Sequence, residues 1–179
     1  MITHLKLQNT DNIKNNIDEI LKTKKEVDLG GDHYSTSKES KQFMLFEHRH
    51  DELLVPVIDF IKNLVEQNRG VNLKLSGAWT VLGQENGYHT VHRHNMTSLE
   101  ELCTVLYLES PLNTPEQDTD GKGAFYYFDY ENSHLMCKHF LPTKGDLLIF
   151  PAYMLHGSYP QAKGLRQTLN LDFSIHGLK

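Results

Sequence analysis

The sequence has only two cysteines, Cys103 and Cys137, among its 179 residues. Two thiols cannot build the disulfide framework on which many small secreted domains depend, and we expect both to be small buried side chains. The sequence also lacks a run of about eighteen apolar residues, the minimum for a membrane-spanning helix. Residues 1–6 contain no apolar run of the kind found in secretory signals. We therefore expect a cytoplasmic protein without a membrane segment.

Positive charge is in the minority, with 18 Lys and Arg residues against 23 Asp and Glu residues, a net charge of -5. This balance gives no strong signal for a nucleic-acid-binding surface. The hydrophobic fraction of 39% and the charged fraction of 23% are ordinary for a globular protein. We expect one domain over residues 1–179, with a helical N-terminal support at 1–70 and a β-rich core at 71–179.

Helix dominates the prediction for residues 1–70. A short alternating strand is expected within residues 1–9, and apolar side chains at helical spacing then predict a helix over about 11–22. Residues 30–42 are polar, so we expect a loop there. A second apolar stripe predicts another helix over about 51–68, with Gly70 as its C-cap.

The hydrophobic period changes at Val71. Beyond this residue apolar and polar side chains alternate, as in half-buried strands, and turn signals such as Asn86-Gly87 separate the segments. We expect strands at 71–76, 78–82, 88–94, 102–109, 124–129, 135–140, 146–150 and 166–175. Short strands at fairly regular spacing are typical of an all-β sandwich or barrel. The sequence leaves open whether the turn-rich connection 112–123 acts as a lid.

Two histidines two residues apart, His92 and His94, are the first indication of chemistry. They lie in Gly-Tyr-His-Thr-Val-His-Arg-His, residues 87–94. Side chains at i and i+2 of a strand point to the same face, so both imidazoles could bind one metal ion. His156 follows far downstream, beyond the apolar run 147–150. We hypothesise that the three histidines meet around a metal ion in the mouth of a barrel.

The pair His48 and His50 provides a control for this hypothesis. With 11 histidines in 179 residues, about 0.7 His-x-His pairs are expected by chance. His48 and His50 precede a predicted helix and are followed by Asp51 and Glu52, without strand or turn context. We interpret this second pair as a solvated polar connection.

A polar face is predicted on the last strand. Polar side chains alternate there with apolar ones, in the order Arg166, Thr168, Asn170 and Asp172. Alternation places these four on one face. A guanidinium on this face could bind a carboxylate through two hydrogen bonds, and the Thr168 hydroxyl could donate another. The alternative is a surface salt bridge from Arg166 to Asp172 or Glu109.

Five segments of the chain carry a family resemblance. They are Trp79-Thr80-Val81, Gly87 to Asn95, Val105 to Pro111, Gly145 to His156 and Arg166-Gln-Thr-Leu-Asn-Leu. Together they resemble the small, prolyl-hydroxylase-like branch of the iron(II)/2-oxoglutarate oxygenases, many of whose members come from phages and marine bacteria. The resemblance covers about residues 72–175. It implies a mainly β fold, a double-stranded β-helix with the N-terminal helices as supporting additions.

The resemblance also implies cofactors and the residues that bind them. The Fe(II) ligands implied are His92, His94 and His156. By the same match Arg166 binds the distal carboxylate of 2-oxoglutarate with help from Thr168. Tyr107 contacts this co-substrate or packs in the core, and we expect Trp79 in the core. The implied reaction consumes O2 and hydroxylates a C–H bond of a small-molecule or peptide substrate, with release of succinate and CO2.

One position departs from the usual pattern of these enzymes. Most bind iron through two histidines and one carboxylate, and the carboxylate usually stands where this chain has His94. An all-histidine set is one interpretation, and the one we favour. A second takes Glu100 or Glu101 as the carboxylate ligand and leaves His94 outside the set. A third shifts the first ligand to His89.

Two other functions compete with the oxygenase. Gly145, Pro151 and His156 are spaced as in the second cupin motif, and a cupin would share the barrel without needing 2-oxoglutarate. The oxygenase, unlike the cupin, requires Arg166 and Thr168 inside the pocket. A non-enzymatic jelly-roll module is the third possibility, and it predicts a shallow pocket with few histidines.

Overall fold

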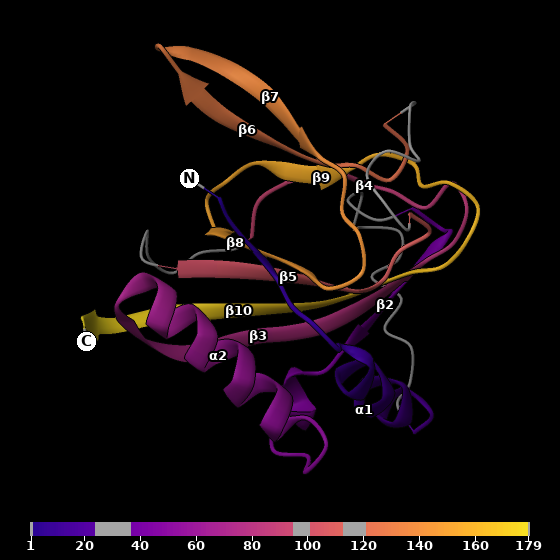
Figure 1. Cartoon of the computed structure of the whole chain (residues 1–179), viewed down its shortest axis with the longest axis vertical. Coiled ribbons are helices and arrows are strands. Elements are labelled where there is room, and N and C mark those ends of the chain that lie inside the picture. The colour runs from indigo at the N-terminus through magenta and orange to yellow at the C-terminus, as the bar shows by residue number, and fades with distance from the viewer. Residues whose placement is uncertain (1, 24–36, 95–100, 113–120, 179) are drawn as a thin grey trace.

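Two antiparallel sheets form the protein, as seen in a computed structural model that describes residues 2–23, 37–94, 101–112 and 121–178. The larger sheet has the strand order β1-β8-β5-β10-β3-β2, and the smaller has the order β4-β9-β6-β7 (Figure 1). Their bounds are β1 Thr3–Lys6, β2 Ser40–Met44, β3 Val71–Gly83, β4 His89–His92, β5 Glu101–Glu109, β6 Phe125–Glu131, β7 His134–Phe140, β8 Asp146–Pro151, β9 His156–Ser158 and β10 Arg166–Leu178. The predicted mainly β double-stranded β-helix is confirmed.

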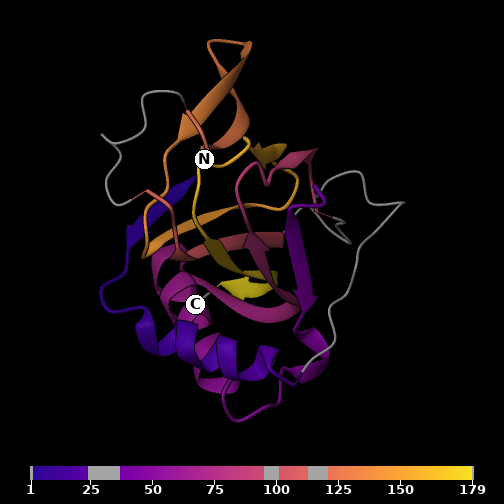
Figure 2. The same cartoon turned by 90° about the vertical axis from the view of Figure 1, so that its right-hand side faces the viewer.

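Both α-helices lie on one side of the larger sheet. Helix α1 spans Asp11–Leu21 and helix α2 spans Val55–Arg69. Figures 1 and 2 show them on the face opposite to the smaller sheet. Gly70 ends α2 with a left-handed backbone conformation at φ 66°, which confirms the predicted C-cap. The helix begins at Val55, beside Pro56, whose missing amide proton suits the first helical turn, a few residues after the predicted outer bound at about residue 51.

The central strands of the larger sheet are buried on both faces. In β5, Leu102, Leu106 and Leu108 pack toward the helices. The intervening residues Cys103 and Tyr107 pack instead into the space between the two sheets. This two-sided burial explains why β5 reads as a continuous apolar run, and it creates two cores. The core between the sheets surrounds the cavity described below.

Two short strands were not expected from the sequence. β2 begins at Ser40, inside the segment 30–42 that was predicted as loop, and it pairs with β3. β9 has only three residues and pairs with β4 and β6. The two segments expected at 71–76 and 78–82 form the single strand β3. β1 and β2 are edge strands of the larger sheet, so residues 1–70 contribute to this sheet as well as supplying helices.

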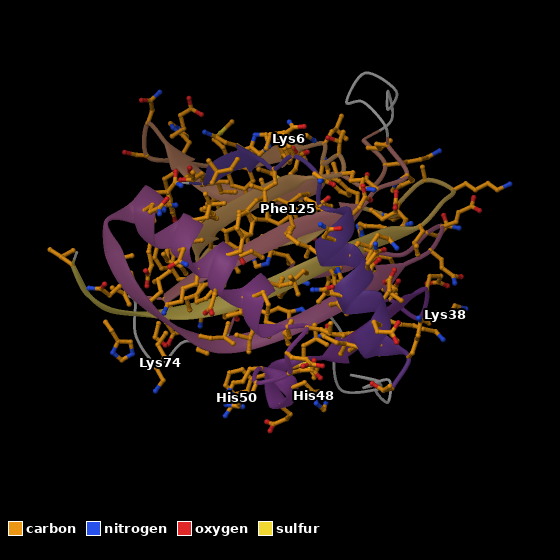
Figure 3. All side chains as sticks on the ribbon, turned by 60° about the horizontal axis from the view of Figure 1, so that its bottom comes forward. Lys6, Lys38, His48, His50, Lys74 and Phe125 are labelled. Atoms are coloured by element: carbon orange, nitrogen blue, oxygen red, sulfur yellow. The ribbon has the colours of Figure 1, made fainter. Side chains whose placement is uncertain are left out.

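The second His-x-His pair lies outside the strands and does not line the cavity. His48 ends a short 3-10 helix, Phe46–His48, and His50 follows in the turn before α2. His50 is exposed and His48 is half-buried. Both lie at the periphery of the molecule (Figure 3).

A buried carboxylate joins the edge strand β1 to β8. Asp146 accepts hydrogen bonds from the backbone amide of Thr143 at 2.6 Å and from the His4 ring at 2.8 Å. The Lys6 ammonium lies 3.1 Å from the same carboxylate. Burial raises the pKa of Asp146, but the hydrogen bonds from Thr143, His4 and Lys6 outweigh it and bring the pKa below its ordinary value. The ionised carboxylate therefore stabilises the folded protein.

We expect Asp146→Asn to lower the free energy of unfolding at pH 7 by about 1–3 kcal/mol, because buried donors lose their charged acceptor. Since the folded pKa of Asp146 is depressed, its contribution is present above the unfolded carboxyl pKa and disappears as pH falls through the folded pKa. Urea unfolding at a series of pH values measures both effects. Asp11→Asn is the control, since Asp11 pairs with Lys144 on the surface and should contribute less than about 1 kcal/mol. Equal losses in the two variants would contradict the stabilising role of Asp146.

Candidate metal centre

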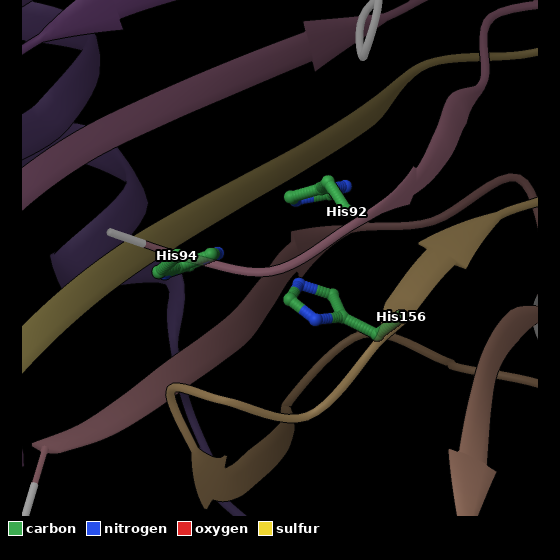
Figure 4. A group of neighbouring side chains, drawn as sticks. All are labelled: His92, His94 and His156. Atoms are coloured by element: carbon green, nitrogen blue, oxygen red, sulfur yellow. The ribbon is translucent and has the colours of Figure 1, made fainter. Parts of the chain in front are cut away.

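Strand pairing brings His92 and His156 together. His92 ends β4, His156 begins β9, and the two residues are direct partners across the strands. Their ring centroids lie 4.4 Å apart. β4 ends at His92, so His94 lies two residues beyond the strand, where its backbone amide donates to the Ala152 carbonyl at 3.2 Å. One ligand atom of each of the three rings lies within 4.8 Å of the other two, and the side chains approach one another in Figure 4.

Hydrogen bonds fix the same tautomer in all three rings. Nδ1 of His92 lies 2.8 Å from the Thr90 carbonyl oxygen, and Nδ1 of His156 lies 2.8 Å from the Met154 carbonyl oxygen. Nδ1 of His94 lies 2.9 Å from each carboxylate oxygen of Asp172. Each acceptor requires a proton on Nδ1, which leaves the lone pair of Nε2 free to bind a metal.

Burial favours the neutral form of two of these imidazoles. It lowers the pKa of His92, and it lowers the pKa of His156 well below the ordinary value, with the neighbouring rings adding to the effect at His156. A histidine must be neutral to donate a lone pair to a metal ion. Phe125 and Phe150 pack against His156 with centroid distances of 5.5 and 4.7 Å, so its ring is held in place by apolar contacts.

A cavity of about 310 Å³ lies beside the three rings. The four polar residues of β10 all line it, namely Arg166, Thr168, Asn170 and Asp172. Their apolar neighbours Leu169 and Leu171 pack toward the helices. The polar face that the alternation predicted therefore lies inside the barrel. The alternative, a surface salt bridge from Arg166, is wrong, since Arg166 is 3% exposed.

The guanidinium of Arg166 is buried beside the cavity. Neither of its terminal nitrogens has a hydrogen-bond partner among the described residues. Burial lowers its pKa, and the nearby Tyr107 opposes the change. A buried cation without an acceptor is costly unless an anion completes it. This feature fits a ligand with a carboxylate group.

Thr168 and Tyr107 adjoin this guanidinium. They are partners across β10 and β5, and both line the cavity. The Thr168 hydroxyl accepts a hydrogen bond from the Asn170 amide at 3.1 Å, so its own proton is available to a ligand. Burial raises the pKa of Tyr107, against the effect of Arg166, so its phenol stays protonated at neutral pH.

Sequence reasoning missed several residues of this cavity. Trp79, which was expected in the core, lines the cavity and packs on His94 with a centroid distance of 5.2 Å. Gln42 also lines it and lies on β2, the strand that was not predicted. Cys103, which was expected only as a small buried side chain, lies beside His94 together with Asp172, which the sequence had already placed on the polar face of the last strand. Two-residue alternation along β5 is the signal that could have placed Cys103 on the cavity side.

The alternative ligands differ in where the structure places them. His89 lines the cavity, but its ring centroid is 6.1 Å from that of His92 and it is absent from the cluster of three. Glu101 is buried on β5 and is likewise outside that cluster. Glu100 and most of the connection 112–123 lie outside the described residues.

The fold and this cavity together define a class, the double-stranded β-helix proteins with a cluster of histidines in the barrel that could hold a metal ion. Residues 77–172 match the family described as "Putative 2OG-Fe(II) oxygenase". The match covers more than half of the chain, and the protein belongs to this family of iron(II)- and 2-oxoglutarate-dependent oxygenases. It is therefore a dioxygenase that uses Fe(II), 2-oxoglutarate and O2. Family membership excludes the cupin and the non-enzymatic module.

Solved structures show the same fold. A prolyl-4-hydroxylase from Pseudomonas putida is similar at 13% identity, with a TM-score of 0.69 over 98% of this chain and 93% of that one. A prolyl hydroxylase from Trichoplax adhaerens has 13% identity and a TM-score of 0.70 over 97% and 83% of the two chains. HygX from Streptomyces hygroscopicus has 11% identity and a TM-score of 0.69 over 97% and 82%. No curated protein sequence matches this chain.

Neither α1 nor α2, nor any other helix in the described parts of the chain, has the length and apolar character needed to cross a membrane.

We expect His156→Ala and His92→Ala each to abolish stoichiometric Fe(II) binding, because two imidazoles would remain of the three that converge. Anaerobic titration with Fe(II), followed by metal analysis of the desalted protein, measures this. The double variant His48→Ala/His50→Ala should retain full metal content. Loss of metal from the double variant, or retention of metal in both single variants, would show that the centre lies elsewhere.

Proposed function

We propose that Nε2 of His92, His94 and His156 binds the iron, and that Arg166 binds the distal carboxylate of 2-oxoglutarate with Thr168 and Tyr107. The enzyme then hydroxylates a C–H bond of a small-molecule or peptide substrate. In this reaction the substrate R–H, 2-oxoglutarate and O2 give R–OH, succinate and CO2.

The observation that carries this proposal is a buried cation in the same cavity as the three imidazoles. Arg166 is 3% exposed, and its terminal nitrogens have no acceptor within the described ranges. A dicarboxylate has one end suited to a guanidinium and another suited to a metal. A 2-oxo dicarboxylate such as 2-oxoglutarate can bind the guanidinium through one carboxylate and the metal through its oxo acid group.

The residues of the chain have distinct roles in the proposed reaction. When bound, the iron supplies the chemistry of O2 activation coupled to decarboxylation of the oxo acid. The three histidines hold their Nε2 atoms ready through the hydrogen bonds at Nδ1, so little reorganisation accompanies metal binding. Arg166 orients the co-substrate. Val105 and Phe125 line the cavity and provide an apolar wall that excludes water from the reacting atoms, and Phe150 packs behind them in the same core.

The substrate class is supported by the structural relatives. The Trichoplax enzyme was crystallised with a peptide fragment of a hypoxia inducible factor, and HygX with hygromycin B. Beyond the histidines and Arg166, the cavity lining includes Trp79 and Gln42, which offer an aromatic face and an amide to a substrate. A side chain of a peptide or a compact small molecule fits a volume of this order.

We also propose a cytoplasmic location. Both cysteines are free: Cys103 is buried as expected, whereas the expectation that Cys137 is buried is wrong, since it lies exposed on β7. An exposed free thiol is typical of a reducing compartment.

We expect Arg166→Ala to weaken 2-oxoglutarate binding by about 10–100-fold, since a charge-assisted bidentate contact contributes about 1.5–3 kcal/mol. The measurement is an anaerobic titration of the Fe(II) protein with 2-oxoglutarate, followed through the weak visible charge-transfer band of the chelated oxo acid. Fe(II) affinity without co-substrate should stay nearly constant. Arg166→Lys should give an intermediate value, because it keeps the charge and loses the fork geometry.

Arg49→Ala is the matched control for this titration. Arg49 stacks over the Phe46 ring at the periphery and does not line the cavity. It should leave the affinity for 2-oxoglutarate unchanged. An Arg166→Ala protein with unaltered affinity would exclude Arg166 as the carboxylate-binding residue, and iron binding without any charge-transfer band would exclude chelation of the oxo acid.

A further inference from the structure

One of the three imidazoles has a charged partner. Nδ1 of His92 and Nδ1 of His156 face backbone carbonyl oxygens, which are neutral. Nδ1 of His94 faces the carboxylate of Asp172, with both oxygens at 2.9 Å. His94 also occupies the position where related enzymes usually have a carboxylate ligand. A carboxylate is therefore present near this position. It lies behind the His94 ring, outside the cluster that His94 forms with His92 and His156.

Asp172 reaches only one of the three rings. It shares a cluster of possible ligand atoms with His94 and Cys103, and it is absent from the cluster that contains His92 and His156. Its arrangement suits a hydrogen-bond acceptor behind a ligand. It does not suit a fourth member of the three-histidine set.

The position of this carboxylate is fixed by its surroundings. Asp172 pairs with Gly77 on β3, where an added Cβ would lie 3.4 Å from the Cβ of Asp172 and 3.3 Å from the Trp79 ring. The absence of a side chain at Gly77 leaves room for both groups. On the other side Asp172 pairs with Cys103 of β5, whose Sγ lies 2.9 Å from Nδ1 of His94, so the thiol adjoins both the ring and the carboxylate.

The position of the His94 ring is also fixed by packing, like that of Asp172. Trp79 packs on it at 5.2 Å between centroids, and the side chains of His94 and Asp172 are 10% and 18% exposed. Burial first, and then the charge of Asp172, raises the pKa of Cys103, so this thiol is neutral and can donate. A carboxylate in so little water interacts strongly with the ring that it faces.

We propose that Asp172 is a positioning residue that supplies, through His94, the negative charge that an all-histidine iron site lacks. Accepting the Nδ1 proton orients the ring and increases the electron-donating strength of Nε2. The iron site then combines three imidazoles with one outer carboxylate. This inference rests on the metal ligands proposed above.

The test compares Fe(II) dissociation constants of the wild type, Asp172→Asn and Asp172→Ala by anaerobic calorimetry. Asn keeps an oxygen acceptor of the same size and removes the charge. We expect about 10–100-fold weaker binding in Asp172→Asn, the range typical of outer carboxylate partners of metal-binding histidines. Asp172→Ala should bind at least as weakly, because it also loses the orientation of His94.

The midpoint potential of the Fe(III)/Fe(II) pair provides a second measurement. Removal of a nearby negative charge favours Fe(II), so the potential of Asp172→Asn should be more positive than that of the wild type. A general loosening of the cavity would weaken metal binding without this directed shift. Weaker binding with an unchanged potential would therefore overturn the charge-supplying role.

The chain offers a matched control in another pair of histidine and buried carboxylate. His4 and Asp146 lie 2.8 Å apart on the edge of the larger sheet, outside the cavity. Asp146→Asn removes the same kind of contact and should leave the Fe(II) dissociation constant unchanged. Equal weakening in Asp146→Asn and Asp172→Asn would overturn the proposal by showing that only global stability matters.

Failure of this inference is distinguishable from failure of the proposed metal ligands. If His92→Ala abolishes Fe(II) binding while Asp172→Asn and Asp172→Ala bind as tightly as the wild type, the ligands stand and the role of Asp172 is overturned. If His92→Ala binds Fe(II) normally, the ligand set itself is wrong and the inference falls with it. Should Asp172→Ala not fold, Asp172→Asn alone decides between these outcomes.

Discussion

The two-residue period of β10 is the constraint on which the remaining structure depends. Leu169, Leu171 and Phe173 face the helices, while the intervening polar residues line the cavity. A slip of one residue in its pairing with β3 or β5 would bury the polar face against the helices and put leucines in the cavity. The same hydrophobic burial that holds α1 and α2 on the sheet therefore also fixes the register of Arg166. The packing of β10 thus determines both the stability of the fold and the geometry of the site.

Much of this arrangement could be predicted from the sequence because it follows from period and turn chemistry. Alternation after Val71 predicted the β-rich region, and Gly70 predicted the end of α2. The polar face of β10 was predicted by the same alternation. The proximity of His92 and His156 could not be predicted from period and turn chemistry, since no local pattern relates residues so far apart in the sequence. There the family resemblance supplied what the period could not.

The features that escaped prediction depend on tertiary contacts. β9 is three residues long, too short for a periodic signal, and its identity as a strand comes from pairing with β4 and β6. The first residues of the edge strand β2, Ser40 to Gln42, are polar and were interpreted as loop, and its identity as a strand comes from pairing with β3. Trp79 was expected in the core from its size, whereas the structure uses it as a wall beside His94. A large aromatic side chain suits either environment, and sequence alone does not distinguish them.

The cavity is built from two sheets that are separate in their hydrogen bonding. His92 and His156 belong to the smaller sheet, and Arg166 and Thr168 belong to the larger one. A dicarboxylate bound as proposed joins the two, so its binding energy also opposes their separation. A ligand at a hundred times its Kd adds about 2.7 kcal/mol to the stability of the state that binds it. The concentration of 2-oxoglutarate would thus set part of the free energy of unfolding as well as the turnover of the enzyme, and the co-substrate would act as a clamp between the two sheets.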